Sequence, residues 1–114
     1  MVVKIAVASS DGINVDQHFG RARGFRIYLL HDSGYEYLET RNTDAPCSGQ
    51  SHDDNALEQA AARISDCRGV VVTQIGAGAI DALIGHRVMA FTLPGTVEEA
   101  FASLIKSKRF ATRS

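Results

Sequence analysis

An imidazole follows the first apolar stretch of this chain, in the segment Val15-Asp16-Gln17-His18-Phe19-Gly20-Arg21-Ala22. Residues 2–8 are apolar apart from Lys4 and predict a core strand, so His18 comes shortly after a strand end. Neutral imidazole is a common metal ligand, and Gly20 allows a ligand to approach the backbone closely. Two interpretations stay open at this point: a turn histidine that bonds its own loop, or a ligand to a metal or cluster.

Two neighbours of His18 have simple expected roles. Asp16 is placed to orient the imidazole by accepting a hydrogen bond from the ring. Phe19 is expected to anchor the loop in the core.

A second group of candidate ligands lies in the longest expected loop, residues 42–54, within Cys47-Ser48-Gly49-Gln50-Ser51-His52. Four residues separate Cys47 from His52, a spacing at which a thiolate and an imidazole can bind one soft metal ion. The alternative is an incidental thiol beside a helix N-terminus. Cys67 lies on the apolar side of the expected helix and is interpreted as a core residue.

A glycine-rich turn, Gly76-Ala77-Gly78-Ala79, opens a helix directly after a strand. Such a turn points free backbone amides outward and forms a weak anion site, although tight packing of strand against helix explains the glycines equally well. No Gly-Lys-Ser or Gly-Lys-Thr follows, so the turn is not a P-loop, and it is not a complete dinucleotide fingerprint.

The expected elements alternate in a way that predicts an α/β fold. The hydrophobic patterns predict five strands: Val2–Ser9, Phe25–His31, Tyr35–Arg41, Val70–Thr73 and Arg87–Leu93. They also predict three helices: Asp54–Cys67, a short one ending at Gly85, and one after the capping box Thr96-Val97-Glu98-Glu99. The order βββαβαβα implies a five-stranded mixed sheet of order 3-2-1-4-5 with strand 2 antiparallel, the ribonuclease H-like arrangement by analogy.

In this topology the loops after the first, third, fourth and fifth strands emerge at one edge of the sheet, where open α/β sheets bind ligands. These loops are residues 9–24, 42–54, 74–78 and 94–96. We therefore expect His18, Cys47, His52 and the Gly76–Gly78 turn to converge.

The bulk composition narrows the class of protein. The 114 residues predict a single domain over residues 1–114, with ordinary apolar (45%) and charged (22%) fractions. A net charge of −1 gives no reason to expect a nucleic-acid partner. No long apolar run predicts a membrane span and no signal peptide is recognisable, so we expect a cytoplasmic protein.

The sequence does not favour catalysis. The first strand carries no acid where ribonuclease H-like nucleases place one, so the clustered carboxylates of two-metal hydrolysis are missing there. No Ser-His-Asp arrangement is recognisable either. Potential ligands and anion donors without an obvious general base indicate binding, and we expect no enzyme.

Several motifs together resemble a known family. The chain is similar to the dinitrogenase iron-molybdenum cofactor biosynthesis family, which includes NifX and NafY type carriers and the C-terminal domain of NifB. The resemblance rests on Ser9-Ser10-Asp11-Gly12, His18-Phe19-Gly20-Arg21-Ala22 within residues 15–25, Ile75-Gly76-Ala77-Gly78-Ala79 and Gly95-Thr96-Val97-Glu98-Glu99-Ala100. The Pro46-Cys47-Ser48-Gly49 loop looks most like the NifB type.

The resemblance implies a ribonuclease H-like fold and a non-catalytic carrier that binds a metal–sulfur cluster transiently and passes it on. The cargo would be an iron–sulfur or heterometal cluster, with molybdenum among the metals, exchanged with donor and acceptor proteins by a monomer or homodimer. The expected metal ligands are His18, Cys47 and His52. The expected pocket residues are Phe19, Gly20, Arg21, Gly76, Ala77 and Gly78.

Two other hypotheses remain open from the sequence. The same loops could form a regulatory or interaction module that binds a small anion or a protein partner without a cluster. A thiol redox protein that uses Cys47, with His52 lowering the pKa of the thiol, is the third possibility.

Overall fold

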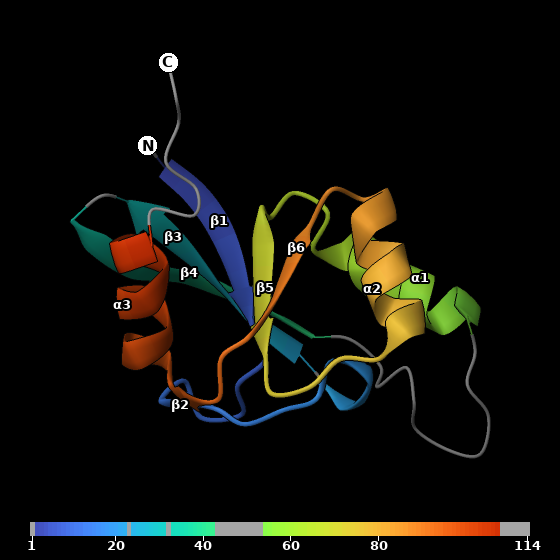
Figure 1. The fold of residues 1–114 in the computed structure, drawn as a ribbon, viewed down its shortest axis with the longest axis horizontal. Helices are drawn as coiled ribbons and strands as arrows, with labels where there is room; N and C mark the ends of the chain where they lie inside the picture. Colours follow the sequence, from blue (N-terminus) through green and yellow to red (C-terminus); the bar gives the residue numbers. More distant parts are fainter. Residues whose placement is uncertain (1, 23, 32, 43–53, 108–114) are drawn as a thin grey trace.

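A computed structural model describes residues 2–22, 24–31, 33–42 and 54–107 of the chain. One mixed sheet forms the centre and helices cover both of its faces (Figure 1). Its strands are β1 (Val2–Val7), β3 (Gly24–His31), β4 (Gly34–Asn42), β5 (Gly69–Val72) and β6 (Met89–Thr92). The helices are α1 (Asp54–Arg63), α2 (Ala77–Gly85) and α3 (Val97–Ser107). The smaller elements are β2 (Asn14–Val15), β7 (Gly95–Thr96) and the 3-10 helix η1 (Phe19–Arg21).

The main sheet has the strand order β4-β3-β1-β5-β6. Strand β3 runs antiparallel to both of its neighbours, whereas β1, β5 and β6 run parallel to one another. The β3–β4 hairpin therefore ends the sheet on one side and β6 ends it on the other. The predicted α/β fold, with a five-stranded mixed sheet and three helices, is confirmed.

The core has two layers, one on each face of the sheet. On one face, α1 and α2 pack on β3 residues such as Phe25 and Ile27. On the other face, α3 packs on Tyr28 and Leu30 through side chains such as Phe101. Successive side chains of a strand point to opposite faces, so the alternation along β3 divides its apolar residues between the two layers.

The first long helix is shorter than its hydrophobic pattern predicted. The pattern runs to Cys67, but α1 ends at Arg63. After it, the backbone amides of Ile64, Ser65 and Cys67 each donate to a carbonyl three residues back, which is a tighter turn than an α-helix. Ile64 and Cys67 are buried all the same, so the apolar pattern continues although the α-helical backbone does not.

The pairing of β2 with β7 was not predicted. Asn14 lies opposite Thr96 and Val15 lies opposite Gly95 in this second, two-stranded sheet. Two residues are too few to show a strand periodicity, so both segments read as loops in the sequence.

The predicted capping box at the start of α3 is present. The Thr96 hydroxyl accepts the amide hydrogen of Glu99 at 3.0 Å, and the Glu99 carboxylate accepts the amide hydrogen of Thr96 at 3.0 Å. The hydrogen bonds from Thr96 to the Glu99 carboxylate hold the pKa of that carboxyl below its usual value. Two amides that would otherwise lack partners are satisfied in this way.

We expect Thr96→Ala to lower the free energy of unfolding by about 1 kcal/mol, because it leaves one helix-end amide without its acceptor. Denaturant unfolding followed by circular dichroism measures the change. Ser103→Ala, on the exposed side of α3, is the matched control and should change it by less than about 0.5 kcal/mol. Equal effects of the two substitutions would contradict a stabilising cap.

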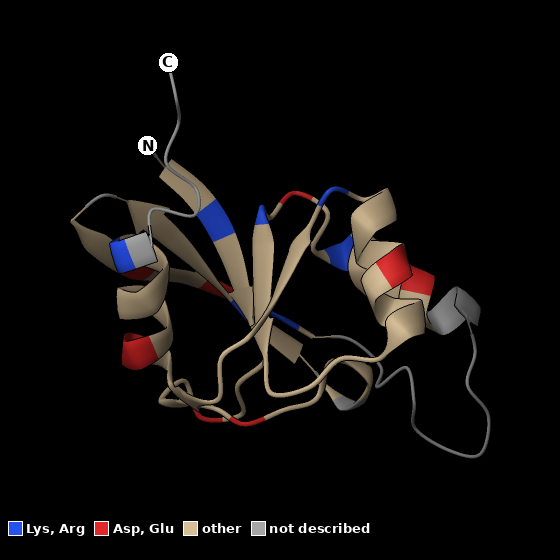
Figure 2. Cartoon of the chain, in the orientation of Figure 1, with Lys and Arg blue, Asp and Glu red and all other residues tan. Residues whose placement is uncertain are grey.

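Charged residues of both signs occur on several elements of the described chain, as the blue and red segments in Figure 2 show. The net charge of the sequence is −1. None of the described helices is long and apolar enough to cross a membrane.

Candidate functional site

The loop that carries His18 lies across the ends of two parallel strands. The amides of Asp16 and Gln17 both donate to the carbonyl of Ala8, each at 3.3 Å. The carbonyl of Gln17 accepts from the amide of Thr73, and the amide of Phe19 donates to the carbonyl of Gln74, both at 3.0 Å. His18 is therefore fixed on both sides to the segment that follows β5.

The loop after β6 joins the same end of the sheet. The amide of Leu93 donates to the carbonyl of Val72 at 3.1 Å, and the amide of Val97 donates to the carbonyl of Ile13 at 2.8 Å. Figure 1 shows the connections after β1, β5 and β6 side by side at one end of the molecule. Three of the four loops expected at this edge thus meet, while residues 43–53 lie outside the described residues.

Phe19 holds the loop to the core. Its side chain is fully buried in the layer under α1 and α2, with its ring centroid 5.5 Å from that of Phe25. The expected anchoring role of Phe19 is confirmed. Because the anchor comes directly after His18, burial of one residue fixes where the other is presented.

The imidazole of His18 is partly buried and caps η1. Its Nδ1 accepts the amide hydrogen of Gly20 at 2.9 Å. The prediction that Asp16 orients the ring is wrong: the Asp16 carboxylate accepts from the amide of Ser10 at 3.0 Å and from its hydroxyl at 2.5 Å. Asp16 closes the loop on itself, and a backbone amide orients the imidazole instead.

This cap determines which ring nitrogen carries the proton. A nitrogen that accepts a hydrogen bond is unprotonated, so the neutral His18 ring carries its hydrogen on Nε2. In this state Nε2 is a donor and suits an acceptor such as a sulfide or an oxyanion. Ligation of a metal through Nε2 would require the proton to move to Nδ1, which ends the bond to Gly20.

We expect neutral His18 in the apoprotein to be the Nε2–H tautomer. Long-range proton–nitrogen NMR spectra at about pH 8, above the range in which histidines usually ionise, distinguish the two tautomers. Observation of the Nδ1–H tautomer would contradict the cap.

Asp11 organises the start of the same loop. Its carboxylate accepts from the amides of Ile13 and Asn14 at 2.8 and 2.9 Å and from the Ser9 hydroxyl at 3.3 Å. The two amide hydrogen bonds lower the pKa of Asp11 from 3.8 to about 2, since they favour the charged form. Gly12 follows with φ +77°, a conformation that side chains rarely adopt.

The pH dependence of the loop follows from this lowered pKa. The contribution of ionised Asp11 is fully present above about pH 4 and is lost as pH falls through about 2. We therefore expect the amide chemical shifts of Ile13 and Asn14 to titrate with a midpoint near 2. Asp11→Asn should abolish the transition, and Asp81→Asn on the exposed side of α2 should leave it in place. A midpoint near 4 would contradict the two amide bonds.

The glycine turn opens α2 with an uncapped N-terminus. Gly76 is the cap residue and offers no side-chain hydrogen bond, and the first turn contains no acid. A Cβ added at Gly76 would meet no atom within 4 Å, so packing of the described residues does not require glycine there. The amides of Ala77 and Gly78 receive no side-chain cap from Gly76, and together with the helix dipole they favour an anionic group at this end. Gln74, bonded to Phe19, brings this turn next to the His18 loop.

The other predicted site residues contribute less to the described geometry. Gly20 supplies the amide that bonds His18, and Arg21 ends η1. Cys47 and His52 lie outside the described residues. Cys67 is a buried free thiol, as expected, and burial raises its pKa to about 12. Among the described residues, no group of three His, Cys, Asp or Glu side chains is arranged to hold a metal ion.

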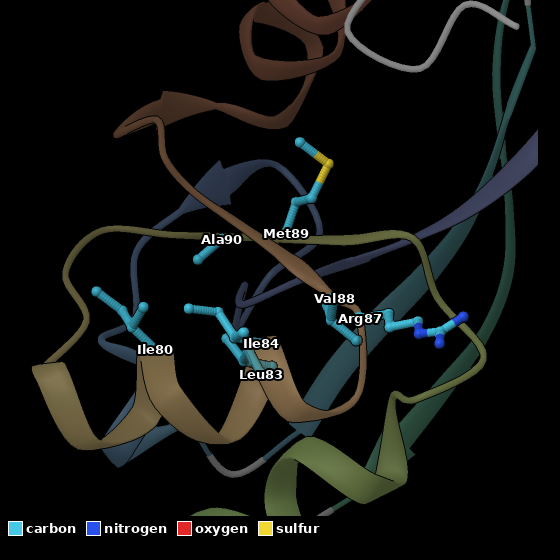
Figure 3. A pocket seen from close by; sticks show the side chains of 7 residues that line it. All are labelled: Ile80, Leu83, Ile84, Arg87, Val88, Met89 and Ala90. Carbon is cyan, nitrogen blue, oxygen red and sulfur yellow. The ribbon is translucent and has the colours of Figure 1, made fainter.

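An apolar groove of about 250 Å³ lies between α2 and β6, at the far side of α2 from its neighbour α1. Figure 3 shows Ile80 and Ile84 of α2 and Ala90 and Met89 of β6 around it. Among its described lining residues, Arg87 is the one charged side chain, and none is a histidine, cysteine or carboxylate. These residues therefore offer no ligand for a metal or a cluster.

Comparison with known proteins identifies the family. The family model described as dinitrogenase iron-molybdenum cofactor matches residues 1–107. The chain belongs to this family. The matched range includes every described element, from β1 to α3.

Curated relatives in the same family carry nitrogen-fixation names. Protein NifY of Klebsiella pneumoniae is 34% identical over 104 residues, covering 90% of this chain and 43% of NifY. The FeMo cofactor biosynthesis protein NifB of Frankia alni is 31% identical over 106 residues, covering 90% of this chain and 21% of NifB. The chain thus spans about a fifth of the NifB relative and less than half of the NifY relative.

Solved structures share the fold at low sequence identity. The protein PH0822 superposes with a TM-score of 0.65 at 19% identity, over 91% of each chain. A Methanocaldococcus jannaschii protein superposes with a TM-score of 0.61 at 11% identity, over 95% of this chain and 92% of its own. These similarities show that the chain shares its fold with both solved structures.

Proposed function

We propose that this protein binds a preformed metal–sulfur cluster as cargo and passes it on without changing it chemically. The binding site is the end of the sheet where the loops after β1, β5 and β6 meet. The family relationship supports a role connected with the iron-molybdenum cofactor. Cluster donor and acceptor proteins would then be the partners of the chain, as monomer or homodimer.

One observation carries the proposal: a partly exposed imidazole is fixed close to a helix N-terminus that has no side-chain cap. Backbone bonds from both neighbours of His18 lead to Thr73 and Gln74, just before Gly76. An imidazole can donate to a sulfide or ligate a metal, and free amides donate to anionic sulfur, a kind of contact that tunes iron–sulfur clusters. The two features together suit an anionic, sulfur-rich cargo.

The chain offers few metal ligands at this end, which suits a cluster whose metals are already coordinated mostly by ligands of the cluster itself. A conventional iron–sulfur cluster needs four protein ligands, usually thiolates. Among the described residues His18 is the one histidine or cysteine at this end, and the Cys67 thiol is buried. Cys47 and His52 complete the proposed ligand set, and Arg21 is included in it as a cation that can contact an anionic cluster. We also propose that the fold is ribonuclease H-like.

Because the His18 side chain caps η1, a substitution that removes the imidazole but keeps a cap tests the imidazole alone. His18→Asn removes the imidazole but keeps a side-chain oxygen that can cap η1, since asparagine is among the best capping residues. His31→Asn is the control, because His31 lies at the β3–β4 turn and bonds Ser33 at 3.2 Å.

Anaerobic gel filtration of the apoprotein with extracted iron–molybdenum cofactor measures binding. We expect visible absorption, iron and molybdenum to co-elute with the wild-type chain and with His31→Asn, and at least tenfold weaker binding by His18→Asn. If His18→Asn bound the cofactor as the wild type does, or if no metal co-eluted with any variant, the proposed function would be wrong.

A further inference from the structure

A polar pocket of about 380 Å³ lies at the start of β3, beside the loop that carries His18. Among its described lining residues Arg26 is the one cation, and the others contribute hydroxyls, carboxamides and backbone. The carboxamides belong to Gln17 and Asn42. None of these described lining residues is Asp or Glu.

The guanidinium of Arg26 is held in place without an ion pair to any described residue. It packs against Gly12, where an added Cβ would lie 3.2 Å from Cζ. Its Nη2 makes a long hydrogen bond of 3.4 Å to the carbonyl of Ser10, and its Nε is buried with no hydrogen-bond partner. No ion pair joins Arg26 to a carboxylate among the described residues, where the cations in ion pairs are Lys4, Arg41 and His86.

The nearest loop carboxylates are already engaged. Asp11 accepts from the amides of Ile13 and Asn14, and Asp16 accepts from the amide and hydroxyl of Ser10. The loop therefore closes over Arg26 while its own acids satisfy backbone amides. A partly buried guanidinium whose one hydrogen bond among the described residues is long is costly, and the part of it that lines the pocket can be stabilised by an anion from outside the chain.

We propose that the Arg26 pocket binds a small oxyanion of the phosphate or carboxylate type. A guanidinium presents donors in a planar fork that matches the oxygens of both groups. The side chains of Gln17 and Asn42 make no hydrogen bond among the described residues and can donate to the same anion. The volume lies near the lower end of small-molecule sites, which suits a small organic anion.

This site is separate from the proposed cluster function. It is built from Arg26, Gln17 and Asn42, and none of its contacts requires His18 or a cluster. Gln17 directly precedes His18, so the anion would be bound next to the cargo site. The two proposals can fail independently because the anion experiment uses no metal.

The test is the thermal midpoint of the apoprotein in inorganic phosphate or malonate, against sodium chloride at equal ionic strength. A ligand that binds only the folded state raises the midpoint in proportion to the logarithm of its concentration above Kd. We expect at least one of the two anions to raise it beyond chloride. Response to phosphate alone, or to malonate alone, identifies which oxyanion the pocket prefers.

Substitutions test whether Arg26 is the residue that binds the anion. Arg26→Gln should weaken anion binding at least tenfold, because a charge-assisted bond is lost. Arg87→Gln removes an exposed arginine outside the pocket and should retain the wild-type response. Arg26→Met should leave the midpoint in chloride equal or higher, since it removes an unsatisfied buried nitrogen, and should abolish the anion response.

If a substitution impairs folding, anion binding can still be measured directly on the wild-type protein. In the wild-type protein, NMR side-chain amide signals of Gln17 and Asn42 should shift on anion titration, and other carboxamide signals should not. The proposal is wrong if the anions raise the thermal midpoint of the wild type and of Arg26→Gln equally. It is also wrong if Arg87→Gln loses as much of the anion response as Arg26→Gln does, or if neither anion raises the midpoint of the wild type beyond chloride.

Discussion

The geometry of the functional end depends on two backbone hydrogen bonds on either side of one residue. Gln17 accepts from Thr73 and Phe19 donates to Gln74, so the loop after β1 is fixed to the segment after β5. Burial of the Phe19 ring then makes the arrangement part of the core. An imidazole between two fixed neighbours has little freedom to move, which is what a binding group needs if it is to be presented in one orientation.

The position of the loop across the end of the sheet also explains which groups its charged side chains bind. A loop that crosses the end of a sheet leaves many amides without strand partners, and Asp11 and Asp16 satisfy several of them. Those carboxylates are then unavailable to His18 and to Arg26. The imidazole takes its hydrogen bond from Gly20, and the guanidinium keeps an unsatisfied nitrogen. Both basic groups are thereby left able to bind something from outside.

Much of the fold could be predicted because its signals are local. The alternation of apolar residues located the strands, the spacing of Leu57, Ala60, Ala61 and Ile64 located α1, and Thr96 with Glu99 located the start of α3. The predicted role of Asp16 failed because the sequence does not say which of several nearby donors a carboxylate will meet. Arg26 gave no signal in the sequence, since an arginine in an alternating strand ordinarily faces water; only its position under Gly12 makes it unusual.

The sequence by itself determined the five main strands, the three helices, the family resemblance and the identity of the candidate ligand His18, because periodicity, capping and short motifs depend on residues close together in the chain. Only the tertiary structure decided which nitrogen of His18 accepts a hydrogen bond, that residues 14–15 pair with 95–96, and that Arg26 has no ion pair among the described residues. These facts depend on contacts between segments far apart in the chain. Such contacts are set by how the whole sheet brings its loops together, and no local pattern of residues encodes them.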